Sequence, residues 1–176
     1  ARDLNDVWGP DATFAVAVGS QGLVAFYDKT KWTATGAYKV SHLRGVWGTA
    51  RTNFYVVGDG GTLGHFTSSG FSDVATGTTE NLRHVWGTGA GDVYVMGDKG
   101  ALLHFDGKKW KPVSGHGAAV TLRAMWGSGP SDLHLLGQAG AMLRFDGSAW
   151  TDLSARVTTA AVNAVWASSA TDLFAA

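Results

Sequence analysis

The chain has 176 residues, enough for one ordinary domain with a substantial core. Fourteen Lys and Arg residues balance 14 Asp and Glu residues, so no net charge favours nucleic acid or an anionic membrane surface. Cysteine is absent, which excludes a disulfide framework and thiolate chemistry, and no apolar run approaches the ~18 residues of a membrane helix.

The first predicted element, LNDVWG (4–9), returns at intervals of 39 or 40 residues. The echo extends over the whole unit, with two glycines after each of the first four tryptophans and two aromatic residues beyond them. The repeated tryptophans are Trp8, Trp47, Trp86, Trp126 and Trp166. Such a period indicates a stacked or circular repeat array. We divide the chain into repeats 4–42, 43–81, 82–121 and 122–161, with a partial repeat 162–176.

Each unit predicts four strands, as the second one illustrates. LRGVWG (43–48) is the first strand, on which we expect Leu43 and Trp47 to share one face and Val46 to occupy the other. NFYVVG (53–58) is nearly continuously apolar, as expected of a strand covered on both faces. The third and fourth strands, TLGHF (62–66) and FSDVAT (71–76), alternate as strands nearer to water do.

Glycine-rich turns join these strands. GSQG, GDGG, GDKG and GQAG separate the second strand from the third, and FDGKKW and FDGSAW contain Asp-Gly hairpin signals. No segment has a sustained 3.6-residue apolar period, which excludes helical solenoids and βαβ arrays. The fold class is therefore all-β. Four antiparallel strands in about 40 residues form the blade of a β-propeller, so we predict four complete four-stranded blades and a partial fifth.

The repeat resembles a known family. The pattern L-x-x-V-W-G, D-[LV]-[FYH]-x-x-G, G-x-L-x-[HR]-F-D-G and a closing Trp, best matched by residues 82–110, resembles a bacterial β-propeller repeat of myxobacterial type. Such repeats occur in large exported or surface proteins and are similar in layout to WD40 and kelch blades. The resemblance implies the fold and an extracellular, periplasmic or cell-surface location, but it implies little about function.

The partial last unit predicts an unpaired strand edge at residues 172–176. Three explanations stay open: a fragment of a longer propeller, completion by another copy, or a five-bladed ring with a degenerate last blade. We expect Val165, Trp166, Leu173 and Phe174 to pack against the fourth blade. The open edge should then meet further residues, another copy of the chain or a protein partner.

One polar position in the first strand of each unit is a candidate binding site. It holds Asn5, Arg44, Arg83, Arg123 and Asn163, which we expect to form a ring at the mouth of the central channel. One interpretation is an anion-binding collar, in which Arg44, Arg83 and Arg123 bind carboxylate, phosphate or sulfate. The other is internal pairing, because Asp59 and Asp98 lie in the nearby turns.

Aromatic side chains of the outer strand offer an alternative site. Trp32, Trp110 and Trp150 could floor repeated shallow pockets between blades, as in lectin propellers that bind carbohydrate. A half-exposed aromatic ring that caps an outer strand would look the same in sequence. For the tryptophans of the first strand, packing between blades is the better interpretation.

The sequence predicts no catalytic site, no metal site and no cofactor. The six histidines form no chelating motif, and no nucleophile elbow, calcium loop or isolated carboxylate pair interrupts the repeats. We therefore predict a non-catalytic binding or structural scaffold that mediates protein–protein interaction. A lectin-like propeller is the alternative, and a hydrolase or lyase would need catalytic residues outside these repeats.

Overall fold

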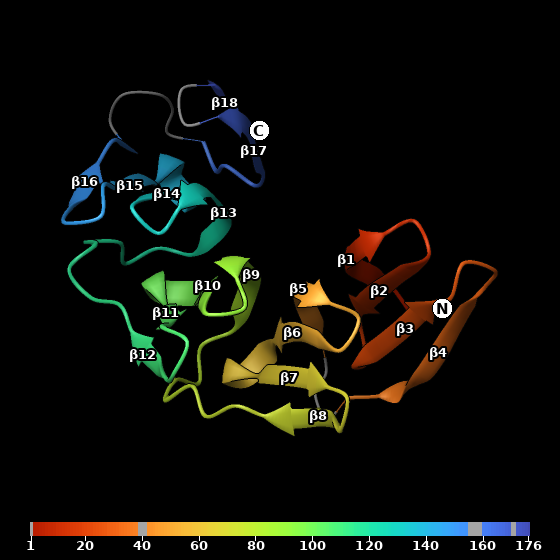
Figure 1. Ribbon diagram of the computed structural model, residues 1–176. Coiled ribbons are helices and arrows are strands. Elements are labelled where there is room, and N and C mark those ends of the chain that lie inside the picture. Colours follow the sequence, from red (N-terminus) through yellow and green to blue (C-terminus); the bar gives the residue numbers. More distant parts are fainter. Residues whose placement is uncertain (1, 39–41, 155–159, 170–171) are drawn as a thin grey trace.

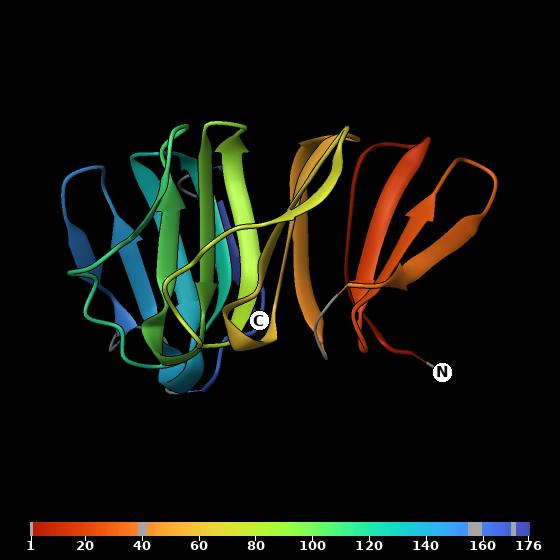
Figure 2. The same ribbon diagram turned by 90° about the horizontal axis from the view of Figure 1, so that it is seen from below.

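The protein is an all-β propeller arc with four complete blades and a two-stranded fifth blade (Figure 1). The computed structural model describes residues 2–38, 42–154, 160–169 and 172–176; for residues 36, 37, 167–169, 173 and 175 only the backbone is described. Seen from below, the blades stand side by side with their antiparallel strands lying roughly along one axis (Figure 2). The predicted fold class is confirmed.

Every complete blade is an antiparallel sheet whose strands follow one another in chain order. The first blade comprises β1 (Leu4–Asp11), β2 (Phe14–Gly19), β3 (Leu23–Tyr27) and β4 (Trp32–Ala37). The second comprises β5 (Leu43–Ala50), β6 (Asn53–Gly58), β7 (Leu63–Thr67) and β8 (Gly70–Asp73). The third comprises β9 (Leu82–Gly89), β10 (Asp92–Gly97), β11 (Leu102–Phe105) and β12 (Trp110–Pro112). The fourth comprises β13 (Leu122–Gly129), β14 (Asp132–Gly137), β15 (Met142–Phe145) and β16 (Trp150–Asp152), and the partial blade comprises β17 (Val165–Ser169) and β18 (Asp172–Ala175).

The glycine-rich turns between the second and third strands contain short 3-10 turns in three blades: η1 (Asp59–Gly61), η2 (Asp98–Gly100) and η3 (Gln138–Gly140). The last glycine of each turn has a positive φ, 74° at Gly100. A Cβ atom on Gly100 would lie 2.0 Å from the backbone oxygen of Ala118. Glycine is therefore required here by both conformation and space. In the part of the chain that is described, no helix is long and apolar enough to cross a membrane.

The innermost strand of each complete blade contains a β-bulge close to its start. In β5 the register places Leu43 opposite Gly58 and Gly45 opposite Val57, so Arg44 is the extra residue. The bulge turns Leu43 and Val46 to the same side, where both pack in the cluster shared with the first blade. The expectation that Leu43 and Trp47 share a face is therefore wrong. Trp47 packs instead against the third blade's cluster.

Each blade consequently has two unlike faces. The leucine and valine of the inner strand face the preceding blade, and the tryptophan faces the following one. A Cβ atom on Gly87 would lie 2.7 Å from the ring of Trp47, and one on Gly127 would lie 2.8 Å from the ring of Trp86. The Trp-Gly pair of the repeat is thus a contact between neighbouring blades. The tryptophan of one blade covers the glycine of the next.

The partial blade follows the same rule, which corrects one expectation. Val162 is buried and, with Val165, packs against the fourth blade. Trp166 and Phe174, by contrast, are 62% and 60% exposed, because they stand on the face that meets a following blade. The side chain of Leu173 lies outside the described part. Among the described residues, no strand pairs with the outer edge of β18.

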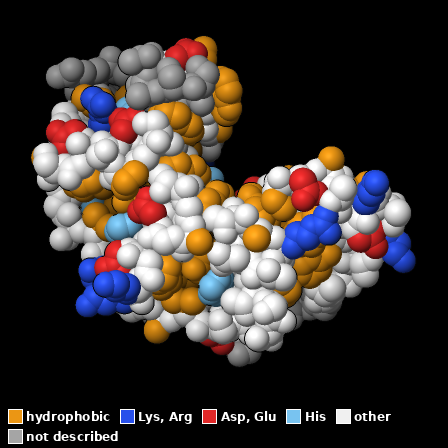
Figure 3. Space-filling view, in the orientation of Figure 1, with side chains coloured by type: hydrophobic (Ala, Val, Ile, Leu, Met, Phe, Trp, Pro, Cys, Tyr) orange, Lys and Arg blue, Asp and Glu red, His pale blue; other side chains and the backbone are white. Residues whose placement is uncertain are grey.

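The arc leaves an open notch between the first blade and the partial blade (Figure 3). On the first blade, Leu4 and Val7 are 62% and 60% exposed, although their counterparts Leu43 and Val46 are buried. The predicted blade count is confirmed, and the described chain forms an open arc.

We expect Gly100→Ala to destabilise the protein by about 2–4 kcal/mol, because the methyl group would meet backbone at a position with positive φ. Gly89→Ala is the control, since an added Cβ atom there meets nothing within 4 Å. Urea unfolding measures both. Equal stability of the two variants would contradict the turn requirement.

We expect Trp86→Ala to cost about 2–4 kcal/mol of unfolding free energy, because its ring packs against the fourth blade's cluster. Trp166→Ala removes the same side chain from an exposed position and should change stability by less than about 0.5 kcal/mol. Thermal and urea unfolding of the pair test this difference. Similar losses in both variants would refute the assignment of faces.

Candidate functional site

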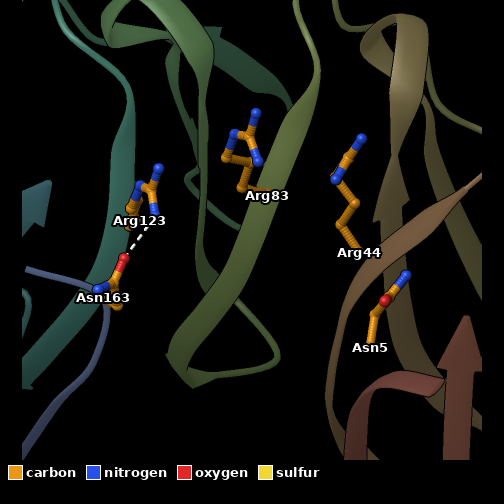
Figure 4. A pocket seen from close by; sticks show the side chains of 5 residues that line it. All are labelled: Asn5, Arg44, Arg83, Arg123 and Asn163. Atoms are coloured by element: carbon orange, nitrogen blue, oxygen red, sulfur yellow. Dashed lines mark hydrogen bonds between the residues drawn. The ribbon is translucent and has the colours of Figure 1, made fainter. Parts of the chain in front are cut away.

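The five predicted collar residues line a single pocket. Its volume is about 260 Å³, and all of its lining residues come from the same position of the five repeats (Figure 4). These are Asn5, Arg44, Arg83, Arg123 and Asn163. In the four complete blades the residue is the extra residue of the β-bulge, which directs it towards the inner side of the arc. We call this set the collar.

Two collar arginines are paired within their own blade. Arg44 donates from Nε to Asp59 Oδ1 at 2.6 Å. Arg83 donates two hydrogen bonds to Asp98, from Nε to Oδ1 at 2.5 Å and from Nη2 to Oδ2 at 3.1 Å. Both carboxylates lie in the 3-10 turns, so the internal pairing considered from the sequence is present in these blades.

Asp98 is held more firmly than a simple ion pair requires. Besides Arg83, it accepts hydrogen bonds from Thr121 Oγ1 at 3.0 Å and Asn81 Nδ2 at 3.1 Å. The hydrogen bond from Arg83 is the main cause that lowers the pKa of Asp98 below its usual range. This carboxylate is ionised at neutral pH and is satisfied by its neighbours.

The third collar arginine differs from the other two. The residue equivalent to Asp59 and Asp98 is Gln138, and Arg123 instead donates from Nη1 to Asn163 Oδ1. The Nε atom of Arg123 is buried without a hydrogen-bond partner. Three guanidinium groups and two carboxylates therefore leave one positive charge in the collar, at Arg123.

The structure does not bring the predicted outer tryptophans into equivalent pockets. Trp110 and Trp150 are partly buried and pack against Phe105 and Phe145, with ring centroids 5.4 Å and 5.0 Å apart. Trp32 is 49% exposed and lines a hollow on the open face of the first blade. A further pocket of about 470 Å³ between the second and third blades has neither Trp110 nor Trp150 in its wall.

A polar contact within the blades was missed from the sequence. His104 Nε2 lies 2.6 Å from Asp92 Oδ1 and its ring stacks on Tyr94, with centroids 4.2 Å apart. Equivalent contacts join His65 to Asn53 and Arg144 to Asp132. The sequence did hold a signal for these contacts, because the polar pairs occupy the same two repeat positions in the second and third strands of three blades.

These contacts give His65 and His104 a structural role within their blades. In the first blade Phe14 and Phe26 pack at the same two positions, so Phe26 is the counterpart of His65. Within the described residues, no group of three or more His, Asp or Glu side chains could hold a metal ion.

On the face shown in Figure 3, charged side chains of both signs are scattered among apolar and neutral ones. In the collar, three arginines from neighbouring blades line one pocket (Figure 4). The arrangement can offer hydrogen-bond donors to an anion.

No protein-family model matches the chain, and no curated protein matches its sequence. Several solved structures match its fold. The WD40 β-propeller domain of Doa1 superposes with a TM-score of 0.80 at 13% identity, covering 99% of this chain and 62% of that one. YCF48 bound to D1 peptide gives a TM-score of 0.70 at 17% identity, covering 95% and 58%.

A third structure is the extracellular domain of the hybrid two-component system BT3049 from B. thetaiotaomicron, with a TM-score of 0.78 at 11% identity, covering 99% and 26%. At these identities the likeness shows the fold alone, and the chain spans less than two thirds of the proteins it matches. The β-propeller family of folds is thereby supported.

The buried ring of His84, which follows Arg83 in the third blade, should make the stability of the fold depend on pH. Burial lowers the pKa of His84 to about 4, so the folded state resists protonation that the unfolded chain accepts near its usual pKa. Stability should therefore fall as pH decreases from about 6.5 towards 4. His84→Ala, which copies Ala124 of the fourth blade, should lose about 2 kcal/mol less than the unaltered protein between pH 7 and pH 4.5. Urea unfolding at both pH values checks this, and identical losses would contradict it.

Proposed function

We propose that this chain is a non-catalytic binding scaffold whose collar pocket receives an acidic segment of a protein partner. The observation that carries the proposal is the convergence of three arginines and two asparagines, from five consecutive repeats, on one pocket. A guanidinium group presents a planar fork of donors that matches a carboxylate. A pocket at the axis of a propeller also gives a partner one defined place to enter.

The reactive side chains of the described blades support a non-catalytic role. Asp92 is occupied by His104 and Thr88, and Asp132 by Arg144 and Ser128. Because these contacts recur at the same place in successive blades, they are explained by folding. An enzyme generally needs a nucleophile or acid–base pair placed beside a substrate pocket, and the collar pocket is lined by arginine and asparagine.

Binding of a protein segment is consistent with what propellers of this shape do elsewhere. YCF48, one of the structural neighbours, is described in complex with a D1 peptide. Another neighbour is an extracellular domain, and an extracellular, periplasmic or cell-surface location belongs to our proposal as well. Strand addition along the outer edge of β18 is a second possible contact with a protein or another copy of this chain.

Carbohydrate binding through the outer tryptophans is the weaker proposal. Two of its three rings, Trp110 and Trp150, are partly buried against neighbouring aromatic rings, which reduces the surface that a sugar could stack on. A glycan array with the folded protein tests it directly.

We expect an array of acetylated, amidated hexapeptides, varied at one central position, to bind best with Asp or Glu there. In the collar variant each ion pair is removed as a unit, by Arg44→Gln with Asp59→Asn and Arg83→Gln with Asp98→Asn, together with Arg123→Gln. This variant should bind the acidic peptides at least about tenfold more weakly. Arg51→Gln, just beyond the C-terminal end of β5 and outside the collar pocket, is the control. Acidic preference that survives in the collar variant, or that is lost equally in the control, would overturn the proposal.

A further inference from the structure

We infer that the collar contains one anion subsite, centred on Arg123, that binds a single carboxylate of a ligand. The inference rests on the proposed function and specifies which of the three arginines acts. It also explains why Arg44 and Arg83 can lie in the collar without binding the ligand.

The third blade shows how a carboxylate sits on a collar arginine. Asp98 takes both Nε and Nη2 of Arg83, at 2.5 Å and 3.1 Å, which is the bidentate geometry that guanidinium and carboxylate prefer. Asp59 occupies Nε of Arg44 in the second blade. The protein thus supplies its own carboxylate to each of these arginines, and a ligand would have to displace it.

The fourth blade keeps the arginine and lacks the carboxylate. Arg44 and Asp59, Arg83 and Asp98, and Arg123 and Gln138 stand at equal spacing along the chain. Gln138 is exposed, and within the described structure its side chain makes no hydrogen bond. The neutral amide of Gln138 therefore stands where the second and third blades have the carboxylate that neutralises their arginine.

The hydrogen bonds of Arg123 leave donors for a ligand. Its Nη1 group donates to Asn163 Oδ1, which fixes the guanidinium plane from the side of the partial blade. Its Nε group is buried and has no partner, so its desolvation is not compensated within the described protein. A carboxylate that engages this edge, as Asp98 engages Arg83, would satisfy that donor and neutralise the remaining charge of the collar.

The pocket also limits the ligand. A volume of about 260 Å³ is at the small end for ligand sites, so it accommodates a carboxylate with its nearest atoms. In a peptide that group is either an Asp or Glu side chain or the chain terminus. Both share the chemistry that Arg123 recognises.

The test observes each arginine separately. Protein labelled with ¹⁵N at arginine Nε is titrated with glutarate and, as the neutral control, with glutaramide, and Arg123→Lys assigns the Arg123 signal. We expect the Nε–H resonance of Arg123 to shift saturably with glutarate alone, while those of Arg44 and Arg83 shift less than about a third as much.

Two substitutions at one position provide the matched comparison. Gln138→Asp restores the repeat's carboxylate and should weaken glutarate binding at Arg123 at least about tenfold, whereas Gln138→Asn, with the same length and no charge, should retain it. Conversely, Asp98→Asn should free Arg83 to bind glutarate, so that its Nε–H resonance also shifts during the glutarate titration. Near-ultraviolet circular dichroism confirms the native fold of each variant.

Peptides then identify the source of the carboxylate. An acetylated, amidated Gly-Ser-Glu-Ser-Gly peptide carries only the side-chain group, and an acetylated Gly-Ser-Gln-Ser-Gly peptide with a free terminus carries only the terminal one. A shift of Arg123 with either peptide supports the inference and names the source.

The inference is overturned if Arg123 fails to shift, if all three arginines shift alike, or if Gln138→Asp binds as tightly as Gln138→Asn. The proposed function fails separately, when acidic peptides bind equally well to the variant that lacks all three collar arginines.

Discussion

The contact between the tryptophan of one inner strand and the glycine of the next determines much of this structure. The ring of Trp47 lies against Gly87 and that of Trp86 against Gly127, at distances that leave no room for a larger residue. Because the contact is directional, every blade has a face for its predecessor and another for its successor. The apolar cores lie between blades, with residues from both neighbours in each cluster, and a blade alone would bury little of its surface.

The collar follows from the same packing. A regular strand would alternate its side chains, so Leu43 and Val46 would point in opposite directions. The bulge at Arg44 turns both towards the preceding blade and leaves the inserted residue unpaired at the inner side of the arc. The position that packing does not need is therefore the one that can vary in charge. In the complete blades it holds one asparagine and three arginines.

Much of the fold could be predicted from the sequence, because the period of the tryptophans and glycines reports the blade directly. The collar residues could also be identified, since they occupy one position of the repeat. The faces on which Leu43 and Trp47 lie could not be predicted. A β-bulge reverses the alternation of side chains after it, and no particular residue type in the sequence marks its position. The choice between the two interpretations of the arginines needed coordinates as well. The sequence placed Asp59 and Asp98 in nearby turns, but only the geometry shows that Arg83 pairs with Asp98 while Arg123 turns to Asn163.

The two faces that border the notch differ in the neighbour that they are shaped to meet. By analogy with the complete blades, Leu4 and Val7 form the face that packs on a preceding blade, and Trp166 and Phe174 form the face that packs on a following one. Association of copies through these faces would place the first-blade face of one copy against the partial-blade face of the next, which is a heterologous, head-to-tail contact. Such contacts end only when a rotation closes them into a ring, and otherwise they propagate as a filament.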